Sequence, residues 1–324
     1  MAVVLPVGGV LTSCVGCMML VEQLAKKEPG CMNLMTFSTF LFIAIEGFIF
    51  SQDFLRRKNK IPIFGGYLKL VIIFFVVNVV NNQALNFHVP VPLHIIFRSG
   101  SLLASLVLGV FLLHRQYSTK KYVSVLLITV GIILCTLATS GQSAPSKDDP
   151  ESHYTQYIIG ITMLTFALIA SAYLGITQER LYAKFGKQPR EALFYVHALS
   201  LPGFLFMWND IYKNILIFNQ SAPLTIPLIG VEVPEMWFYL LLSDVAQYGC
   251  IRCVYILTSE VTSLTVTLVV TLRKFISLLI SIVYFQNPFT WLHWVGTFLV
   301  FFGTLLFSDF GPQKKSASEK AKTQ

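Results

Sequence analysis

Ten apolar runs of roughly twenty residues, joined by short polar connections, follow one another along this 324-residue chain. A helix needs about 20 mainly apolar residues to cross the hydrocarbon core of a bilayer. Of all residues, 55% are hydrophobic and 12% are charged, too few charges to cover a soluble protein of this size. We therefore predict an all-α polytopic membrane protein, with the lipid bilayer as its surroundings. The ten predicted spans are residues 3–24, 34–52, 64–87, 90–113, 120–140, 157–178, 192–218, 235–258, 262–286 and 290–309.

A polar stretch rich in Ser, Pro, Lys and Asp divides the ten spans into two groups of five. Because five is odd, the second group enters the membrane in the opposite sense, which is an inverted-topology repeat typical of secondary transporters. Weak internal similarity supports the repeat, since Gly131 in the first half matches Gly303 in the second. The predicted units are a first five-helix repeat at 1–140, a luminal linker at 141–156, a second five-helix repeat at 157–309 and a cytosolic tail at 310–324.

The basic residues indicate how the spans are oriented. Fifteen Lys and Arg residues fall in connections and tail on one side of the predicted membrane, and four fall on the other. The positive-inside rule places the basic side, and with it both termini, in the cytosol. The glycosylation sequon Asn219-Gln220-Ser221 then falls on the luminal side, in agreement. The net charge of +8 is explained by topology, and no nucleic-acid partner is expected.

Three cations lie inside predicted spans without an acid within a helical turn in sequence: Arg98, Arg273 and Lys274. A charge at the bilayer centre costs about 2.5–3.5 kcal/mol on insertion scales, so each needs a compensating interaction. An anion-binding site is one explanation, and pairing with acids from other helices is the other. For Arg252 the competing partners are Asp244 and Glu260.

Four predicted helices carry polar residues at helical spacing, which predicts a shared aqueous cavity. Packing between helices explains single Ser and Thr residues equally well, and interhelical hydrogen bonds explain the asparagines. The stripes are Asn78, Asn81, Asn82 and Asn86; His94, Arg98, Ser101 and Ser105; Gln247, Tyr248 and Arg252; and Thr267, Thr271, Lys274, Ser277 and Ser281.

The chemistry of the stripes favours a phosphorylated, polyhydroxylated metabolite. Arginine matches phosphate oxygens bidentately and lysine adds a point charge. Amide and tyrosine side chains can read a nucleobase or sugar hydroxyls. The predicted substrate-binding residues are Lys274, Arg273, Arg98, Asn78, Asn81, Asn82, His94, Gln247, Tyr248, Arg252 and Thr271.

Two CxxC pairs, Cys14/Cys17 and Cys250/Cys253, lie inside apolar runs with no His or acidic ligand set beside them. We interpret these cysteines as packing residues rather than as a zinc or redox centre, and expect neither metal nor cofactor. The sequence contains no DxD, HExxH or GxSxG motif, so the chain is predicted not to be an enzyme. A membrane-embedded transferase and a small-molecule exporter remain the alternatives.

Three segments closely resemble nucleotide-sugar transporters of the drug/metabolite transporter superfamily. They are VVNNQALNFHVPVPLHIIFRSGS from Val79, LFYVHALSLPGF from Leu193 and SLTVTLVVTLRKF from Ser263. The resemblance implies ten helices in inverted repeats. It also implies exchange of a cytosolic UDP-sugar, UDP-N-acetylglucosamine or UDP-xylose, for luminal UMP across a Golgi or endoplasmic reticulum membrane. Transporters of this family use a basic residue of the ninth helix for the phosphate, which here corresponds to Arg273 or Lys274.

The last five residues fit the cytosolic dilysine pattern KxKxx, with Lys320 and Lys322 at the two lysine positions. Such tails are read by a receptor, and here they suggest coat-protein recognition and return from Golgi to endoplasmic reticulum. An ordinary charged tail is the alternative explanation.

Overall fold

The structure, a computed structural model, describes residues 4–54, 56, 58–87, 89–114, 116–142, 150–225, 230, 232–260 and 263–307. The described residues are mostly helical. The α-helices are α1 (Val4–Lys27), α2 (Met32–Glu46), α3 (Leu68–Gln83), α4 (Val91–Ser99), α5 (Ser101–Leu113), α6 (Thr119–Gln142), α7 (Pro150–Phe185), α8 (Pro189–Ala198), α9 (Trp208–Asn219), α10 (Glu235–Glu260), α11 (Ser263–Val283) and α12 (Trp291–Phe307). Short 3₁₀ or π-helical turns adjoin them: η1 (Pro29–Cys31), η2 (Gly47–Ser51), η3 (Ile63–Tyr67), η4 (Ala84–Asn86) and η5 (Leu201–Met207).

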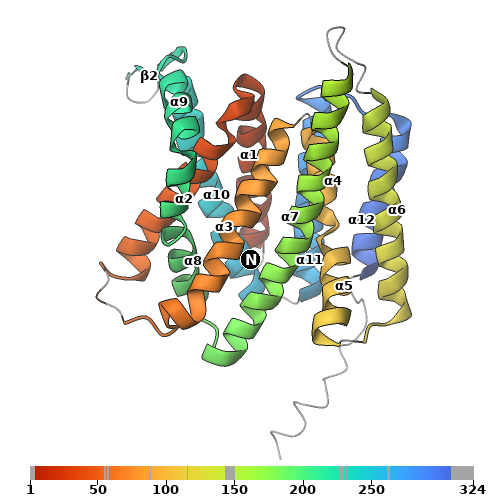
Figure 1. The fold of residues 1–324 in the computed structure, drawn as a ribbon, viewed down its shortest axis with the longest axis horizontal. Helices are drawn as coiled ribbons and strands as arrows, with labels where there is room; N and C mark the ends of the chain where they lie inside the picture. Colours follow the sequence, from red (N-terminus) through yellow and green to blue (C-terminus); the bar gives the residue numbers. More distant parts are fainter. Residues whose placement is uncertain are drawn as a thin grey trace, which may run out of the picture.

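The helices form one bundle and run between its two ends (Figure 1). Among the described residues, seven helical segments are long and apolar enough to cross a membrane, and α12 is a shorter apolar helix. Helices α10 and α11 lie over the predicted spans at 235–258 and 262–286. Helical structure thus occupies all ten predicted runs. That ten helices cross the membrane, in two inverted repeats, stays a prediction.

Two of the predicted spans are each built from two helices. The span at 90–113 divides into α4 and α5 at Gly100, where an added Cβ would lie 2.6 Å from Ile132 Cδ1. The span at 192–218 divides into α8 and α9 through η5, which has Pro202 in its first turn. Proline lacks an amide N–H and clashes with the preceding turn, so a continuous helix is disfavoured there.

Helices α6 and α12 pack through glycines. An added Cβ on Gly131 would lie 2.5 Å from the carbonyl oxygen of Gly296, and one on Gly296 would lie 2.5 Å from Cys135 Sγ. On Gly303 it would lie 2.8 Å from the carbonyl oxygen of Ser124. Small residues let membrane helices approach closely, and dispersion forces then hold them together. Gly131 and Gly303, the pair matched between the two halves of the sequence, thus both lie in this interface.

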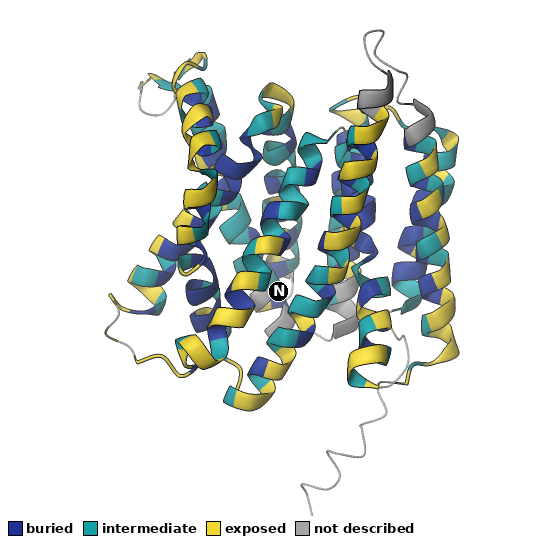
Figure 2. Cartoon of the chain, in the orientation of Figure 1, coloured by how far each residue is buried: buried dark blue, intermediate teal, exposed yellow. Residues whose placement is uncertain are grey.

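The outer face of the bundle is apolar. Phe64, Phe206 and Phe298 are 87%, 94% and 67% exposed, so these large side chains have no protein neighbour to cover them. Exposed positions lie on the outside and at the ends of the helices, and buried positions face inward (Figure 2). This arrangement is typical of a protein that lipid surrounds.

A small hairpin departs from the all-α prediction. Strands β1 (Pro223–Thr225) and β2 (Glu232–Pro234) pair antiparallel, with Leu224 opposite Val233. Strands of three residues carry too little alternation to be recognised in sequence. Helix α7 also begins at Pro150, inside the predicted linker at 141–156, of which residues 143–149 lie outside the described part of the chain.

The orientation of the bundle gives a first prediction. The β1–β2 hairpin lies at the end of the bundle opposite the α7–α8 connection (Figure 1). This opposite end is basic, with Lys184 near the end of α7, Lys187 in the connection and Arg190 at the start of α8. We expect this basic end to be cytosolic. Tags at either terminus should be digested by protease in intact microsomes, whereas a tag inserted in the hairpin should be protected. A protected C-terminal tag would contradict the topology. The tail, with Lys320 and Lys322, lies outside the described residues.

Candidate functional site

A cavity of about 560 Å³ lies inside the bundle. Helices from both predicted repeats line it: α1, α3, α4 and α5 from the first, and α7, α10 and α11 from the second. A polar cavity enclosed by membrane helices is the setting in which transporters hold their substrates. Six predicted substrate-binding residues line it: Asn78, Asn81, Arg98, Gln247, Arg273 and Lys274.

The three cations lie together in this cavity. Lys274 Nζ lies 3.5 Å from the carbonyl oxygen of Arg98 and 3.5 Å from Ser99 Oγ. Arg98 itself has an accessible side chain although it sits within the bundle, because it projects into the cavity. The polar stripes of the predicted spans 4 and 9 are therefore brought to one place.

None of these cations has an acidic partner in the described part of the chain. Arg273 donates one hydrogen bond, 3.4 Å long, to Cys250 Sγ, and its buried Nε has no partner among the described atoms. The single ion pair formed by described residues joins Lys27 to Glu235, Nζ to Oε1 at 2.5 Å. Pairing with acids from other helices, the alternative that the sequence left open, is therefore not seen for these three residues.

Neutral polar groups complete the cavity wall. Asn78 Nδ2 donates to the carbonyl oxygen of Phe74 at 2.8 Å, and no described residue donates to the amide oxygen of Asn78. Gln247 Oε1 accepts a 3.1 Å hydrogen bond from Cys17 Sγ, which leaves the amide NH₂ group as the donor available to a ligand. Ser277 Oγ is buried and unpaired among the described residues. The wall therefore offers both donors and acceptors.

Three predicted residues lie behind the wall. Asn82 Nδ2 donates to Thr36 Oγ1 at 2.6 Å and its Oδ1 accepts from Asn81 at 3.2 Å. A ring nitrogen of His94 lies 3.2 Å from the carbonyl oxygen of Asn81. Thr271 is 6% exposed and is absent from the cavity lining. Asn82 and His94 thus hold Asn81 in place, a supporting position that differs from the direct contact predicted for them.

Tyr248 and Arg252 do not face this cavity. They line a second cavity of about 350 Å³, next to Glu46 and Arg190. The Tyr248 hydroxyl donates to Glu46, and the Arg252 guanidinium lies 5.7 Å from the centre of the Tyr248 ring. Their assignment to the same cavity as Gln247 is therefore corrected.

Asp244 is not a partner of Arg252. Its carboxylate accepts hydrogen bonds from Ser38 and from Thr39 Oγ1, the latter at 2.6 Å, and the residue is 2% exposed. These bonds join α2 to α10. The side chain of Glu260, the other acid considered for Arg252, lies outside what the structure describes.

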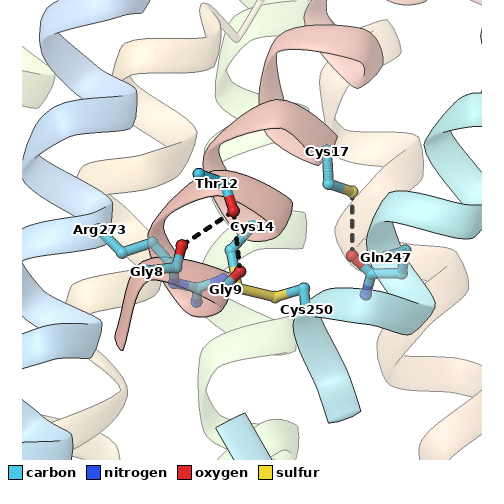
Figure 3. The surroundings of a disulfide bond; sticks show 8 residues. All are labelled: Gly8, Gly9, Thr12, Cys14, Cys17, Gln247, Cys250 and Arg273. Carbon is cyan, nitrogen blue, oxygen red and sulfur yellow. Dashed lines mark hydrogen bonds between the residues drawn. A yellow bond between two sulfur atoms is a disulfide. The ribbon is translucent and has the colours of Figure 1, made fainter. Parts of the chain in front are cut away.

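Two cysteines that were interpreted as packing residues are bonded to each other. Cys14 of α1 and Cys250 of α10 form a disulfide beside the cavity (Figure 3). In the same view Cys17 points to Gln247, and Arg273 lies close to the bond. The pairing joins the two CxxC motifs, one cysteine from each, and links the two predicted repeats. Sequence alone could not show it, because both residues lie in apolar runs.

Sequence reasoning missed the part of the wall formed by α7 and α1. The residues concerned are Met18, Leu164, Ala167, Leu168 and Ser171. Four of these five side chains are apolar, so in sequence they cannot be told from residues that face lipid or core. Their position suggests an apolar surface for the rings of a ligand.

Comparisons with known proteins agree with a transport site. A family model described as the UAA transporter family matches residues 2–311. A "UDP-xylose and UDP-N-acetylglucosamine transporter" of Danio rerio is 51% identical over 304 residues, covering 93% of this chain and 92% of the relative. The human "Nucleotide sugar transporter SLC35B4" is 52% identical over 309 residues, covering 94% and 93%. A Drosophila melanogaster "Endoplasmic reticulum GDP-fucose transporter" is 49% identical, covering 95% and 92%.

Proposed function

The chain belongs to the UAA transporter family, and from its cavity we propose that it carries UDP-sugars into the lumen of the Golgi or endoplasmic reticulum. UDP-N-acetylglucosamine and UDP-xylose are the proposed cargo, because two similar relatives are named for nucleotide sugars and one of them for these two. The proposed mode is antiport, with UMP leaving as the sugar nucleotide enters. We propose no chemistry on the substrate.

The observation that carries the proposal is the group of Arg98, Arg273 and Lys274 without an acid among the described residues. Holding positive charges inside a membrane bundle without a counter-charge is costly, and a ligand anion can supply that counter-charge. A diphosphate brings about two negative charges and oxygens that a guanidinium can bind in pairs. The cavity of about 560 Å³ falls within the usual range for a small-molecule site.

Contacts at the hairpin end support alternating access. Buried Glu22 of α1 accepts hydrogen bonds from Ser281 Oγ of α11 at 2.8 Å and from Asn287 Nδ2 at 2.5 Å. Lys26 Nζ donates to the carbonyl oxygen of Phe285 at 2.5 Å. These bonds join the two predicted repeats at the end proposed to be luminal. We propose that they break when the cavity opens to the lumen.

A GDP-sugar is the second candidate cargo, because one relative of similar identity is named a GDP-fucose transporter. The same phosphate site would bind both nucleotides, so selectivity for the nucleobase must come from the neutral groups that line the central cavity. Thermal-shift titration of the purified protein with UMP, GMP and CMP tests this directly. A larger shift of the thermal midpoint with UMP than with GMP or CMP supports UDP-sugars as cargo. A larger shift with GMP would instead indicate GDP-sugars.

We propose that the protein resides in the Golgi or endoplasmic reticulum membrane with both termini in the cytosol. A relative named for the endoplasmic reticulum supports the compartment. The dilysine pattern at Lys320 and Lys322 supports retrieval by a coat protein.

Substrate choice gives a second prediction. Asn81→Ala should change the ranking of nucleotides in the thermal-shift series, since a buried group that hydrogen-bonds a ligand discriminates against analogues that leave it unpaired. Asn86→Ala is the matched control, because Asn86 belongs to the same stripe but is absent from the cavity lining. An unchanged ranking with reduced protein yield would assign Asn81 to helix packing.

A further inference from the structure

The second cavity lies between α2, α8 and α10, toward the end of the bundle that is predicted to be cytosolic. Glu46 ends α2, Arg190 is the second residue of α8, and Arg252 lies about two turns before the end of α10. The function proposed above does not use these residues. The pocket holds about 350 Å³, enough for a phosphate group and part of its ester.

The two arginines in this cavity have no counter-charge bound to them. The described residues form no ion pair with either guanidinium, and no hydrogen bond to either is found within that part of the chain. Glu46 lines the same cavity and accepts a hydrogen bond from Tyr248, but it forms no ion pair with either described arginine. Arg190 is exposed and Arg252 is partly buried against the Tyr248 ring. Both guanidinium groups are therefore available to an external anion.

The three cavities adjoin one another around α10. Ile251 lines both the central cavity and a third cavity of about 280 Å³. Arg190 and Arg252 line this third cavity and also the second one. Because Ile251 and Arg252 are consecutive in α10, the arginine pair lies on the helix face next to the one that lines the central cavity. A phosphate held by the arginines would therefore lie next to the third cavity, which shares Ile251 with the central cavity.

We propose that Arg190 and Arg252 form a cytosolic access site, which captures the diphosphate of a nucleotide sugar before it reaches the central cavity. This inference rests on the proposed transport function. A guanidinium pair near the surface raises the local concentration of an anion and speeds its capture, and such steering weakens as salt is added. The central cations then take over the phosphates, so the access site affects the rate of loading rather than the final affinity.

The test compares Arg190→Gln and Arg252→Gln with wild type in proteoliposomes that contain UMP. Each variant should lower uptake of labelled UDP-N-acetylglucosamine about tenfold at substrate concentrations far below saturation. The maximal exchange rate and the thermal shift given by UMP should stay within about twofold of wild type, because the central site is intact. Uptake by the variants should also depend less on ionic strength.

Lys187→Gln is the matched control, because this exposed cation lies at the same end of the bundle but lines none of the three cavities. It should leave sub-saturating uptake unchanged, and Arg190→Lys should retain most of it. Equal uptake by wild type and both glutamine variants at low substrate would overturn the proposal. So would a loss of UMP binding equal to the loss of uptake, which would place the arginines in the central site.

The source of the phosphate is tested with lipid composition. Anionic phospholipid can act through the pocket only if it binds there, so its effect is compared between wild type and the two glutamine variants. If it changes the activity of wild type alone, and the variants take up substrate normally at low concentration, the pocket holds a lipid headgroup and the proposal fails. A wild-type protein that exchanges no nucleotide sugar would instead contradict the proposed function itself, so the two failures are distinguishable.

Discussion

Lys274→Ala should abolish nucleotide-sugar exchange without loss of folded protein. Its ammonium group lies in the central cavity next to Arg98, and no acid among the described residues neutralises it. In the proposed complex Lys274 pairs with a phosphate of the ligand. Removing one partner of a buried charge pair costs about 2–5 kcal/mol, which corresponds to roughly a thirtyfold to several-thousandfold loss of affinity. Initial exchange rates and UMP thermal shifts of purified Lys274→Ala measure both losses.

Lys274→Arg separates charge from geometry at this position. The charge is kept, but the guanidinium differs in reach and donor geometry, so we expect partial activity. Arg98→Gln should resemble Lys274→Ala, because both cations line the same cavity. Wild-type exchange by Lys274→Ala and Arg98→Gln together, with normal folding, would assign these cations a structural role.

Gly296→Leu should lower the yield of folded protein more than any of the substitutions in the two cavities. Its added Cβ alone would lie 2.5 Å from Cys135 Sγ and 2.7 Å from the carbonyl oxygen of Gly131, and the backbone atom cannot rotate away. Overpacking of a well-packed interior typically costs about 1–3 kcal/mol. Separation of α6 from α12 should appear as a lower thermal midpoint and a smaller monodisperse fraction after detergent extraction.

Gly175→Leu is the matched control for this effect. Gly175 lies within a long apolar helix, α7, and an added Cβ there would meet no atom within 4 Å. The same chemical change should therefore leave yield and thermal midpoint near those of wild type. Equal losses for the two variants would show that glycine as such, and not the α6–α12 contact, is needed.

The sequence predicts the helices well and their interruptions poorly. Length and hydropathy locate all ten apolar runs, because the bilayer imposes one physical requirement on every span. The break at Gly100 lies in close contact with Ile132, which apolar periodicity does not reveal. The 3₁₀ turn at Pro202 follows from proline itself, which a count of apolar residues does not take into account. The strands of the β1–β2 hairpin are too short to show alternation in sequence, and the bond between Cys14 and Cys250 joins residues 236 positions apart.

For the candidate site, charge is a better guide than stripe membership. Arg98 and Lys274 line one cavity, since an intramembrane cation must face a polar interior. The stripe predicted on α10, which consists of Gln247, Tyr248 and Arg252, combined residues from two different faces of the helix. Gln247 shares the central face with residues 250, 251 and 254, at the spacing i, i+3, i+4 and i+7, whereas Tyr248 and Arg252 are four apart on the neighbouring face. Adjacent residues differ by about 100° around a helix, which was enough to separate the two cavities.

Counterflow in proteoliposomes tests the central claim most directly. Vesicles containing the purified protein are preloaded with UMP, with CMP or with buffer, and offered labelled UDP-N-acetylglucosamine and UDP-xylose outside. If the protein is an antiporter that binds phosphate through Arg98, Arg273 and Lys274, UMP-loaded vesicles should accumulate label several times faster than the others, and Lys274→Ala should remove this difference. Uptake that is independent of the internal nucleotide, or no uptake of either UDP-sugar by the folded wild-type protein, would contradict it.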